Sequence, residues 1–328
     1  MRQPTIHDVA RAAGVSVASV SRALNGHANV RVDMRERVRE AVDQLGYTPN
    51  AAARSLSMAL TQTIGVVVPD LHGEFFSELI RGMDGAAGSD GYQLLLSTMH
   101  ADVALAGQAL RAMRGRVDGL IVMAPQMTPA ELDALLPVGL PTVLAICAPG
   151  GNRPMFGIDN CGGAAAAAQH LVGLGRRKIV HIMGPDRNID ARARRDSFVA
   201  ELHRAAPDAV LKLMPGDFHE DSGAAAVRTL IQGGEAFDAI FAANDMMALG
   251  ALLECRALGL DVPGDVAIVG FDDVPLARFM GLTTMRVHVA DIGARAVDAL
   301  VTMIRAPDEM QAGAELTPEL VIRQSSSA

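Results

Sequence analysis

From residue 63 onward, short apolar segments alternate with helical segments, and this alternation constrains the fold more than any other feature. The apolar segments have the length of buried strands and lie at 64–68, 93–96, 119–123, 142–145, 156–158, 179–183, 210–213, 239–241 and 266–269. Helical stretches fill much of the space between them, for example at 75–87, 101–114, 164–174 and 245–258. Such alternation predicts parallel, doubly wound α/β sheets. Because about 265 residues exceed what one sheet usually needs, we expect two Rossmann-like lobes with a cleft between them.

The first sixty residues have a different texture and predict three short helices. Apolar residues recur at helical spacing, and capping residues and glycines mark where each helix begins and ends. The predicted caps are Thr5 with Asp8, Ser16, and Asp33 with Glu36, and the predicted stops are Gly14 and Gly46. A tight turn containing Gly14 joins the first two helices, which is the outline of a helix-turn-helix head.

The second of these helices carries residues suited to reading DNA. If Val20 and Leu24 point inward, the residues on the outer face are Val17, Ala18, Ser21 and Arg22. Arginine binds the guanine O6 and N7 atoms as a fork, and small apolar side chains contact thymine methyl groups. Ser16 and Ser21, together with the helix N-terminus, suit phosphate oxygens. The alternative from the pattern alone is a small helical packing domain with incidental polar residues.

Charge is distributed unevenly between the head and the rest of the chain. Up to Leu60 there are eight arginines and five acidic residues, a net charge of +3, whereas the remainder carries a net charge of −11. A basic head on an acidic body suggests that the head meets a polyanion.

Several other classes of protein are disfavoured by composition and motifs. Aromatic residues make up only 3% of the chain and three cysteines form no CxxC pair, which argues against an RNA-recognition platform, a disulfide framework and a thiolate zinc site. Nine scattered histidines show no metal-ligand spacing, and we find no P-loop, HExxH, GxSxG or strand-linked GxGxxG motif. No signal peptide or membrane span is evident. We therefore expect a soluble cytoplasmic protein that is not an enzyme and needs no metal or cofactor.

Six segments of the chain carry a family resemblance. They are TIHDVARAAGVS at 5–16, VSRALN at 20–25, GYTPNAAARSL at 46–56, VVVP at 66–69, AANDMMALG at 242–250 and VGFDD at 269–273. Together they closely resemble the LacI/GalR family of bacterial transcriptional regulators, and the resemblance covers essentially the whole chain.

The resemblance implies an α/β protein with an N-terminal helix-turn-helix DNA-binding head (1–48), a hinge helix or linker (49–62) and a two-lobed core (63–328). The core would be periplasmic-binding-protein-like, with doubly wound parallel sheets, and would bind an effector and dimerise. The hinge helix is implied to form only when two subunits sit together on DNA, which suits a short Ala-rich segment capped by Asn50. Leu56 matches the family's minor-groove wedge, with an ordinary linker leucine as the alternative. The further residues implied in DNA binding are Thr5, Asn25, Tyr47 and Ala53.

The resemblance also implies an effector site in the cleft. Arg192, Asn244 and Asp272 match polar positions that contact an effector, and the rings of Phe75, Phe76 and Phe218 are expected to cover it. A bidentate donor, an amide and a carboxylate suit vicinal hydroxyl groups. Each residue also has a structural reading, as a helix cap, a loop cap or core. Near the pocket, Glu74 and His288 depart from the family pattern, and with His72 they either alter ligand choice or are solvated rim residues.

The sequence thus predicts a regulator, most simply a repressor, that binds a palindromic operator as a homodimer under control of a small molecule. A sugar is the expected effector, and a nucleoside, purine or sugar phosphate is the alternative. A sugar-binding transport protein would share the lobes but lack the head. Residues 316–328 contain no useful leucine heptad, which favours a dimer over a tetramer. Induction and corepression both remain open.

Overall fold

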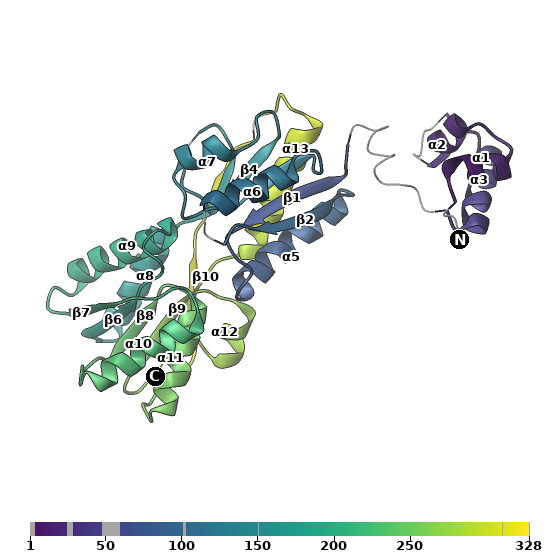
Figure 1. The fold of residues 1–328 in the computed structure, drawn as a ribbon. Coiled ribbons are helices and arrows are strands. Elements are labelled where there is room, and N and C mark those ends of the chain that lie inside the picture. Colours follow the sequence, from purple (N-terminus) through teal and green to yellow (C-terminus); the bar gives the residue numbers. More distant parts are fainter. Residues whose placement is uncertain are drawn as a thin grey trace. The chain divides into compact units, whose positions relative to one another are not determined.

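The computed structural model describes residues 4–24, 29–47, 60–100, 103–149, 151–309 and 311–327 of the chain. By its internal contacts the chain divides into two compact units, residues 1–61 and 62–328 (Figure 1). The first is helical and the second is built on two parallel sheets.

The first unit, called the head below, is a cluster of three helices around a small apolar core. The helices are α1 (Ile6–Ala13), α2 (Val17–Leu24) and α3 (Val32–Leu45). Their buried side chains are Val9, Ala10, Ala13, Val20, Ala23, Val38 and Ala41. Gly14 and Gly46 end α1 and α3 with φ of +63° and +59°, a conformation in which glycine carries no Cβ penalty. The three predicted helices and both predicted stops are confirmed.

The predicted helix caps are right for two helices and wrong for the third. The carboxylate of Asp8 accepts hydrogen bonds from the backbone N–H and the hydroxyl of Thr5, at 2.9 and 2.7 Å. Ser16 caps α2, since its side-chain oxygen accepts the backbone N–H of Ser19 at 3.2 Å. Helix α3, however, begins at Val32, so Asp33 lies inside its first turn and does not cap it. There its charge still interacts favourably with the helix dipole.

The second unit, called the core below, consists of two lobes, each built on a six-stranded sheet. Lobe one holds the strand order β11-β5-β4-β3-β1-β2, and lobe two holds β12-β10-β9-β8-β6-β7. The strands of lobe one are β1 (Thr63–Val68), β2 (Gln93–Thr98), β3 (Gly119–Val122), β4 (Thr142–Ala145), β5 (Met155–Ile158) and β11 (Ala314–Leu316). Those of lobe two are β6 (Lys178–Ile182), β7 (Val210–Met214), β8 (Ala239–Ala242), β9 (Ala267–Asp272), β10 (Thr283–Arg286) and β12 (Glu319–Val321). All pairings are parallel except that of β10 with β12.

Helices cover the sheets, as expected for doubly wound layers. Lobe one carries α5 (Glu74–Ser89), α6 (Val103–Met113), α7 (Pro129–Leu135) and α13 (Val289–Arg305). Lobe two carries α8 (Asn160–Gly173), α9 (Ile189–Ala205), α10 (Glu220–Gln232), α11 (Asp245–Ala257) and α12 (Pro275–Met280). The chain passes between the lobes three times, after β5, after β10 and between β11 and β12 (Figure 1). The expected two-lobed α/β fold is confirmed.

All nine expected strands are present, but three further strands were not predicted. Strand β10 begins with Thr283 and Thr284, whose hydroxyl groups are buried and hydrogen-bonded rather than apolar. Strands β11 and β12 are only three residues long and partly exposed. Such short strands exist because a neighbouring strand pairs with them, which local periodicity does not reveal.

Candidate functional site

In the head, the outer face of α2 presents the residues expected to read DNA, with one correction. Ala18 and Arg22 are exposed, and Nε of Arg22 donates to the carbonyl of Ala18 at 3.3 Å. Ser21 is half-buried. Val17 was expected on the exposed face, but it is half-buried and packs against the head's apolar core. Because a helix turns by about 100° per residue, Val17 lies at the edge between the two faces.

The remaining DNA-binding candidates fall partly outside the described residues. Thr5 and Ser16 lie at the N-termini of α1 and α2, where their hydroxyl groups take part in capping. Tyr47 is half-buried and packs against the head core. The candidates that lie outside the described residues are Asn25, Asn50, Ala53 and Leu56, and with them most of the expected hinge 49–62.

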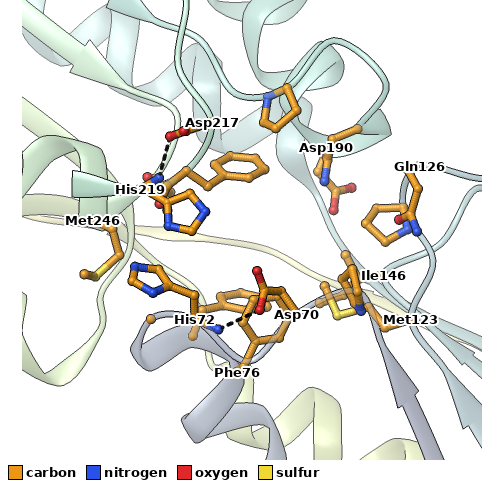
Figure 2. Close-up of a pocket in the computed structure, with 18 of the residues that line it drawn as sticks. Asp70, His72, Phe76, Met123, Gln126, Ile146, Asp190, Asp217, His219 and Met246 are labelled. Atoms are coloured by element: carbon orange, nitrogen blue, oxygen red, sulfur yellow. Dashed lines mark hydrogen bonds between the residues drawn. The ribbon is translucent and has the colours of Figure 1, made fainter. Parts of the chain in front are cut away.

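In the core, a cavity of about 560 Å³ lies between the two lobes. Eight strands point their carboxyl ends at it, since each ends in a lining residue or is followed closely by one: β1, β2, β3, β4, β6, β7, β8 and β9. Figure 2 shows these side chains converging from loops of both lobes. Ligands of open parallel sheets bind at this edge, so the topology alone makes the cavity the candidate effector site.

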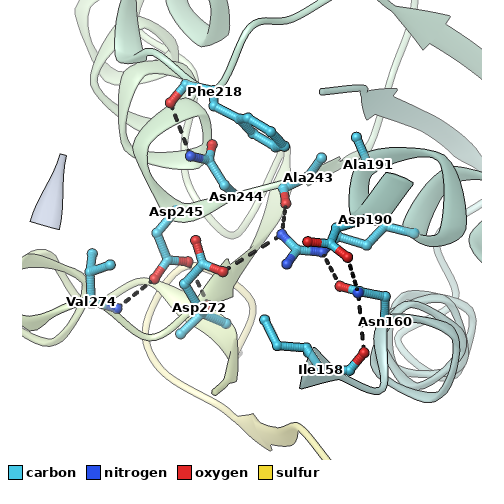
Figure 3. Close-up of polar contacts among 12 residues, drawn as sticks. Ile158, Asn160, Asp190, Ala191, Phe218, Ala243, Asn244, Asp245, Asp272 and Val274 are labelled. Carbon is cyan, nitrogen blue, oxygen red and sulfur yellow. Dashed lines mark hydrogen bonds and ion pairs between the residues drawn. The ribbon is translucent and has the colours of Figure 1, made fainter. Parts of the chain in front are cut away.

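The floor of the cleft is organised around a buried arginine, Arg194 on α9. Figure 3 labels the residues that it contacts, Asn160, Ala243 and Asp272. Its Nε donates to Oδ1 of Asn160 at 2.7 Å, and Nη1 donates to the carbonyl of Ala243 at 2.5 Å. Its guanidinium carbon lies 3.7 Å from the ring centroid of Phe271, and Nη1 lies 3.6 Å from Oδ1 of Asp272. A charge buried to this extent requires such compensation.

Asp190 and Asp272 lie beside this arginine and Asp245 lies beside Asp272, and burial shifts all three carboxyl groups toward the protonated form. Burial raises the pKa of Asp272 to about 7; Arg194 opposes the shift and Asp190 adds to it. Burial likewise raises the pKa of Asp190, against the opposing charge of Arg194. The pKa of Asp245 lies well above its ordinary value because the carboxyl is fully buried and close to Asp272. Near neutral pH the floor thus offers protonated carboxyl groups, which can donate a hydrogen bond, as well as ionised ones, which only accept.

Aromatic rings form the walls. Phe75 and Phe76 follow the first residue of α5 and meet edge to face with centroids 5.6 Å apart, while Phe218 enters from the loop before α10. Phe218 has φ of +75°, an unfavourable conformation for a non-glycine residue. Its ring reaches over Gly184, where an added Cβ would approach it to 2.6 Å. All three phenylalanines line the cavity as expected.

Of the three polar candidates, the structure places two in the cleft and one outside it. Asn244 and Asp272 line the cavity. Asn244 also caps α11, since Oδ1 accepts the N–H of Met247 at 3.0 Å and Nδ2 donates to the carbonyl of Phe218 at 2.9 Å. The capping interpretation is therefore confirmed, and the role of Asn244 in effector binding stays a prediction.

Arg192 does not reach the cleft; it is exposed, and Arg194 stands at the floor instead. Asn188 caps α9, so Asp190 lies in the first turn of the helix. Arg194, four residues further on, lies on the same face as Asp190. The buried positions of α9 follow this face at Ala191, Arg194, Phe198 and Leu202. Helical spacing counted from the cap would have identified Arg194. Sequence reasoning missed Asn160 and Asp190. Asn160 lies 34 positions before Arg194 in the chain, and Asp190 has the sequence context of an ordinary acidic residue in the first turn of a helix.

The three residues predicted near the rim of the cleft, His72, Glu74 and His288, lie in different surroundings. Glu74 accepts the backbone N–H of Leu276 at 2.8 Å and so joins α5 of lobe one to the N-terminus of α12 in lobe two. His72 lines the cavity, whereas His288 is exposed and lies outside it.

Comparison with known proteins agrees with this geometry. A model of the lacI family of bacterial regulatory proteins matches residues 5–50, and a model of a periplasmic binding protein-like domain matches residues 168–326. The chain is 34% identical over 333 residues to the HTH-type transcriptional repressor PurR of Haemophilus influenzae (strain PittEE), with 98% of each chain covered. The chain belongs to the lacI family of bacterial regulatory proteins.

Other members extend the comparison. This lacI-family chain is 34% identical over 331 residues to the ribose operon repressor of Escherichia coli (strain K12), covering 98% of this chain and 99% of that repressor. A crystal structure of the lac repressor dimer bound to operator and the anti-inducer ONPF superposes with a TM-score of 0.90 at 27% identity, covering 100% of both chains. The lacI-family protein described here is accordingly a DNA-binding transcriptional regulator with an effector-binding core, and not an enzyme. No helix among its described residues has the length and apolar character that a membrane span requires.

Proposed function

We propose that this protein is a homodimeric repressor that binds a palindromic operator in the cytoplasm and responds to a small polyhydroxylated ligand, a sugar, held in the core cleft. The observation that favours a sugar is a buried polar atom without a partner at the floor of the cleft. Oδ1 of Asp272 is buried without a hydrogen-bond partner, and it lies 3.6 Å from Nη1 of the buried Arg194. A buried acceptor without a partner, next to a guanidinium group, suits a ligand hydroxyl group, which both donates and accepts.

The walls support the same ligand class. The apolar faces of Phe76 and Phe218 suit the C–H face of a sugar ring between polar edges. A flat heterocycle would also stack there, and one relative is named PurR, so a nucleoside or purine is the second candidate. The ribose operon repressor, equally similar, favours the sugar.

Control of DNA binding follows from the position of the cleft between two lobes. A ligand that contacts both lobes shifts their equilibrium by the difference between its affinities for the two arrangements. Since three chain passages join the lobes, such a shift is a hinge motion. Whether the ligand weakens or strengthens operator binding is decided by which arrangement it prefers.

In the head, we infer that α2 lies in the major groove of each operator half-site, with Arg22 reading one base pair. Exposed Ala18 lies one turn before Arg22 and leaves room for the groove edge. The similarity to an operator-bound dimer supports this arrangement. Residues 49–62, with Asn50, Ala53 and Leu56, are proposed as the hinge that joins the two heads over the minor groove.

The ligand proposal is tested by thermal-shift screening against pentoses, hexoses, sugar phosphates, nucleosides and purines. A ligand that binds only the folded protein stabilises it by about 2.7 kcal/mol at a hundredfold excess over Kd. We expect a sugar to raise the Tm of the wild type and of Arg192→Gln, and to leave Arg194→Gln unchanged. A hit only among purines would replace the sugar by the second candidate. Equal responses of the Arg192 and Arg194 variants would refute the assigned site.

The DNA proposal is tested by selecting duplexes that bind the full chain and measuring affinity for single-base variants of the selected operator. Arg22→Ala should cost about 1–3 kcal/mol and relax specificity at one base pair of each half-site. Arg11→Ala is the control, because Arg11 is also exposed but lies on α1. An Arg22→Ala protein that keeps its specificity at every position would exclude the assigned recognition role.

A further inference from the structure

Three side chains of types that can bind a metal ion lie close together at the mouth of the core cleft. They are His72, His219 and Glu220, and one ligand atom from each lies within 4.8 Å of the others. Nε2 of His72 lies 3.1 Å from Oε2 of Glu220. The imidazole rings of His72 and His219 have centroids 4.2 Å apart and planes tilted by 41° (Figure 2). Among the described residues, this is the one such group of three or more.

The three residues come from different lobes. His72 follows β1 of lobe one, whereas His219 caps α10 and Glu220 begins that helix in lobe two. The cluster therefore spans the cleft, and a ligand bound by all three would hold the two lobes together.

The backbone of each histidine is held by a hydrogen bond to the aspartate two residues before it. Oδ1 of Asp70 accepts the backbone N–H of His72 at 3.3 Å, and Oδ1 of Asp217 accepts that of His219 at 2.9 Å. These bonds position the backbone and do not use the imidazole nitrogens, which are the atoms that would bind an ion. The side chains of His72 and Glu220 are 43% and 46% exposed, so both can adjust and an ion can enter from solvent.

The dimensions suit a small transition-metal ion. Zn²⁺ binds histidine nitrogen and carboxylate oxygen at about 2.0–2.2 Å, which places neighbouring ligand atoms of a tetrahedral site about 3.3 Å apart. The distance of 3.1 Å between Nε2 of His72 and Oε2 of Glu220 is close to this value, and the remaining separations need a closure of at most about 1.5 Å. Imidazole donors favour Zn²⁺, Co²⁺ or Ni²⁺ over Mg²⁺ or Ca²⁺. A simple pair of His72 with Glu220 would give no reason for the second imidazole.

We propose that His72, His219 and Glu220 bind a first-row transition-metal ion such as Zn²⁺ across the mouth of the cleft. Three protein ligands leave one coordination position of a tetrahedral ion for water or for a donor atom of a molecule in the cleft. Because the ligands belong to both lobes, the ion stabilises the arrangement in which the lobes are close. This departs from the sequence-based expectation that the protein has no metal site.

The experiment is calorimetric titration of untagged, metal-free full chain with Zn²⁺, followed by Co²⁺ absorption spectroscopy to report the ligand set. We expect one ion per chain. His72→Gln and His219→Gln should each weaken binding at least tenfold, and Glu220→Gln should weaken it as well. His100→Gln is the matched control, since His100 also lines the cleft from lobe one but bonds to Thr98 at 3.1 Å. Its Zn²⁺ affinity should equal that of the wild type.

A second readout tests the bridge between lobes. At the same Zn²⁺ concentration, Zn²⁺ should raise the Tm of the wild type and of His100→Gln more than that of either the lobe-one variant His72→Gln or the lobe-two variant His219→Gln. The Tm of each variant in chelator reports whether it folds normally. A wild type that binds no Zn²⁺, or variants at both histidines that bind it as the wild type does, would overturn the proposal. Neither effector nor DNA is present, so this result is independent of the proposed function.

Discussion

The buried charges around Arg194 show how single residues set the chemistry of the cleft. One cation and the carboxyl groups of Asp190, Asp245 and Asp272 share a volume with little solvent. Water is replaced there by the amide of Asn160, the carbonyl of Ala243 and the ring of Phe271. Because the carboxyl groups outnumber the cation, proton binding compensates part of the negative charge.

A pH dependence of stability follows at this scale. Asp272 has a pKa of about 7 in the folded protein and an ordinary value near 3.8 when unfolded. Between these two values the folded state binds more protons than the unfolded state, so the free energy of unfolding decreases as pH rises. The loss is complete above about pH 7 and is on the order of a few kcal/mol. Asp190 and Asp245, whose pKa values are also raised, act in the same direction.

Asp272→Asn should therefore flatten the pH dependence of unfolding between pH 4 and 7. The measurement is urea unfolding at several pH values, and the slope against pH is the readout because the substitution also removes a counter-ion of Arg194. Asp208→Asn, at an exposed carboxylate, should keep the wild-type slope. Identical slopes for Asp272→Asn and the wild type would contradict the shifted pKa.

At the scale of elements, lobe one depends on the close approach of α5 and α13. Gly82 of α5 faces α13 so closely that an added Cβ would lie 1.9 Å from the carbonyl oxygen of Ala290. In return, Gly293 of α13 approaches α5, where a Cβ would lie 2.3 Å from the carbonyl oxygen of Leu79. Backbone atoms cannot move aside as a flexible side chain can, so both positions require glycine.

Two alanine substitutions one turn apart test this packing. Gly82→Ala should destabilise the core by about 1–3 kcal/mol or more, because the two helices must separate. Gly85→Ala, on the exposed side of α5 with no atom within 4 Å of the added Cβ, should stabilise it by about 0.5–1 kcal/mol. Denaturant unfolding measures both. Equal effects of the two substitutions would show that helix propensity, and not contact with α13, determines the change in the free energy of unfolding.

At the scale of the whole molecule, contacts across the cleft hold the lobes in the observed arrangement. Besides the three chain passages, Glu74 on α5 accepts the N–H of Leu276 on α12 at 2.8 Å. A net hydrogen bond of this kind contributes about 0.5–1.5 kcal/mol, enough to bias a two-state hinge severalfold.

Glu74→Ala should therefore shift the core toward an open arrangement. We expect a larger radius of gyration by small-angle scattering and a weaker affinity for the cleft ligand, by a factor of about 2–10. The control is Glu78→Ala on the same helix, whose carboxylate bonds to Arg81 within α5 and does not reach lobe two. If both variants scatter like the wild type, the contact of Glu74 does not govern the hinge.

The division of the chain into two units predicts where proteases cut. Internal contacts separate residues 1–61 from 62–328, so the junction is the segment in which cleavage disrupts least structure. Limited proteolysis should cut between residues 57 and 62 and leave a core that still shows the ligand-dependent rise in Tm but binds no operator. Mass spectrometry locates the cut. A core fragment that retains operator affinity would contradict the assignment of DNA binding to the head.

Much of the fold was predictable because local features encode it. Glycine at the ends of α1 and α3 is required by a left-handed backbone, and apolar runs identify strands that are buried on both faces. Strands β10–β12 escaped prediction because their stability comes from pairing and from buried hydroxyl groups. In the head, Val17 was misassigned because it lies at the boundary of a helical face.

The sequence by itself determined most of the elements, the two-part organisation and the family, since propensity, periodicity and motif spacing are local properties. Tertiary structure alone decided which side chains meet. It turned Arg194 rather than Arg192 into the cleft, because the orientation of a helix depends on its cap and on the core it covers. It also brought His72 to His219 and Glu220 across two lobes, a contact between residues almost 150 positions apart. Such contacts arise from sheet topology, which no local pattern contains.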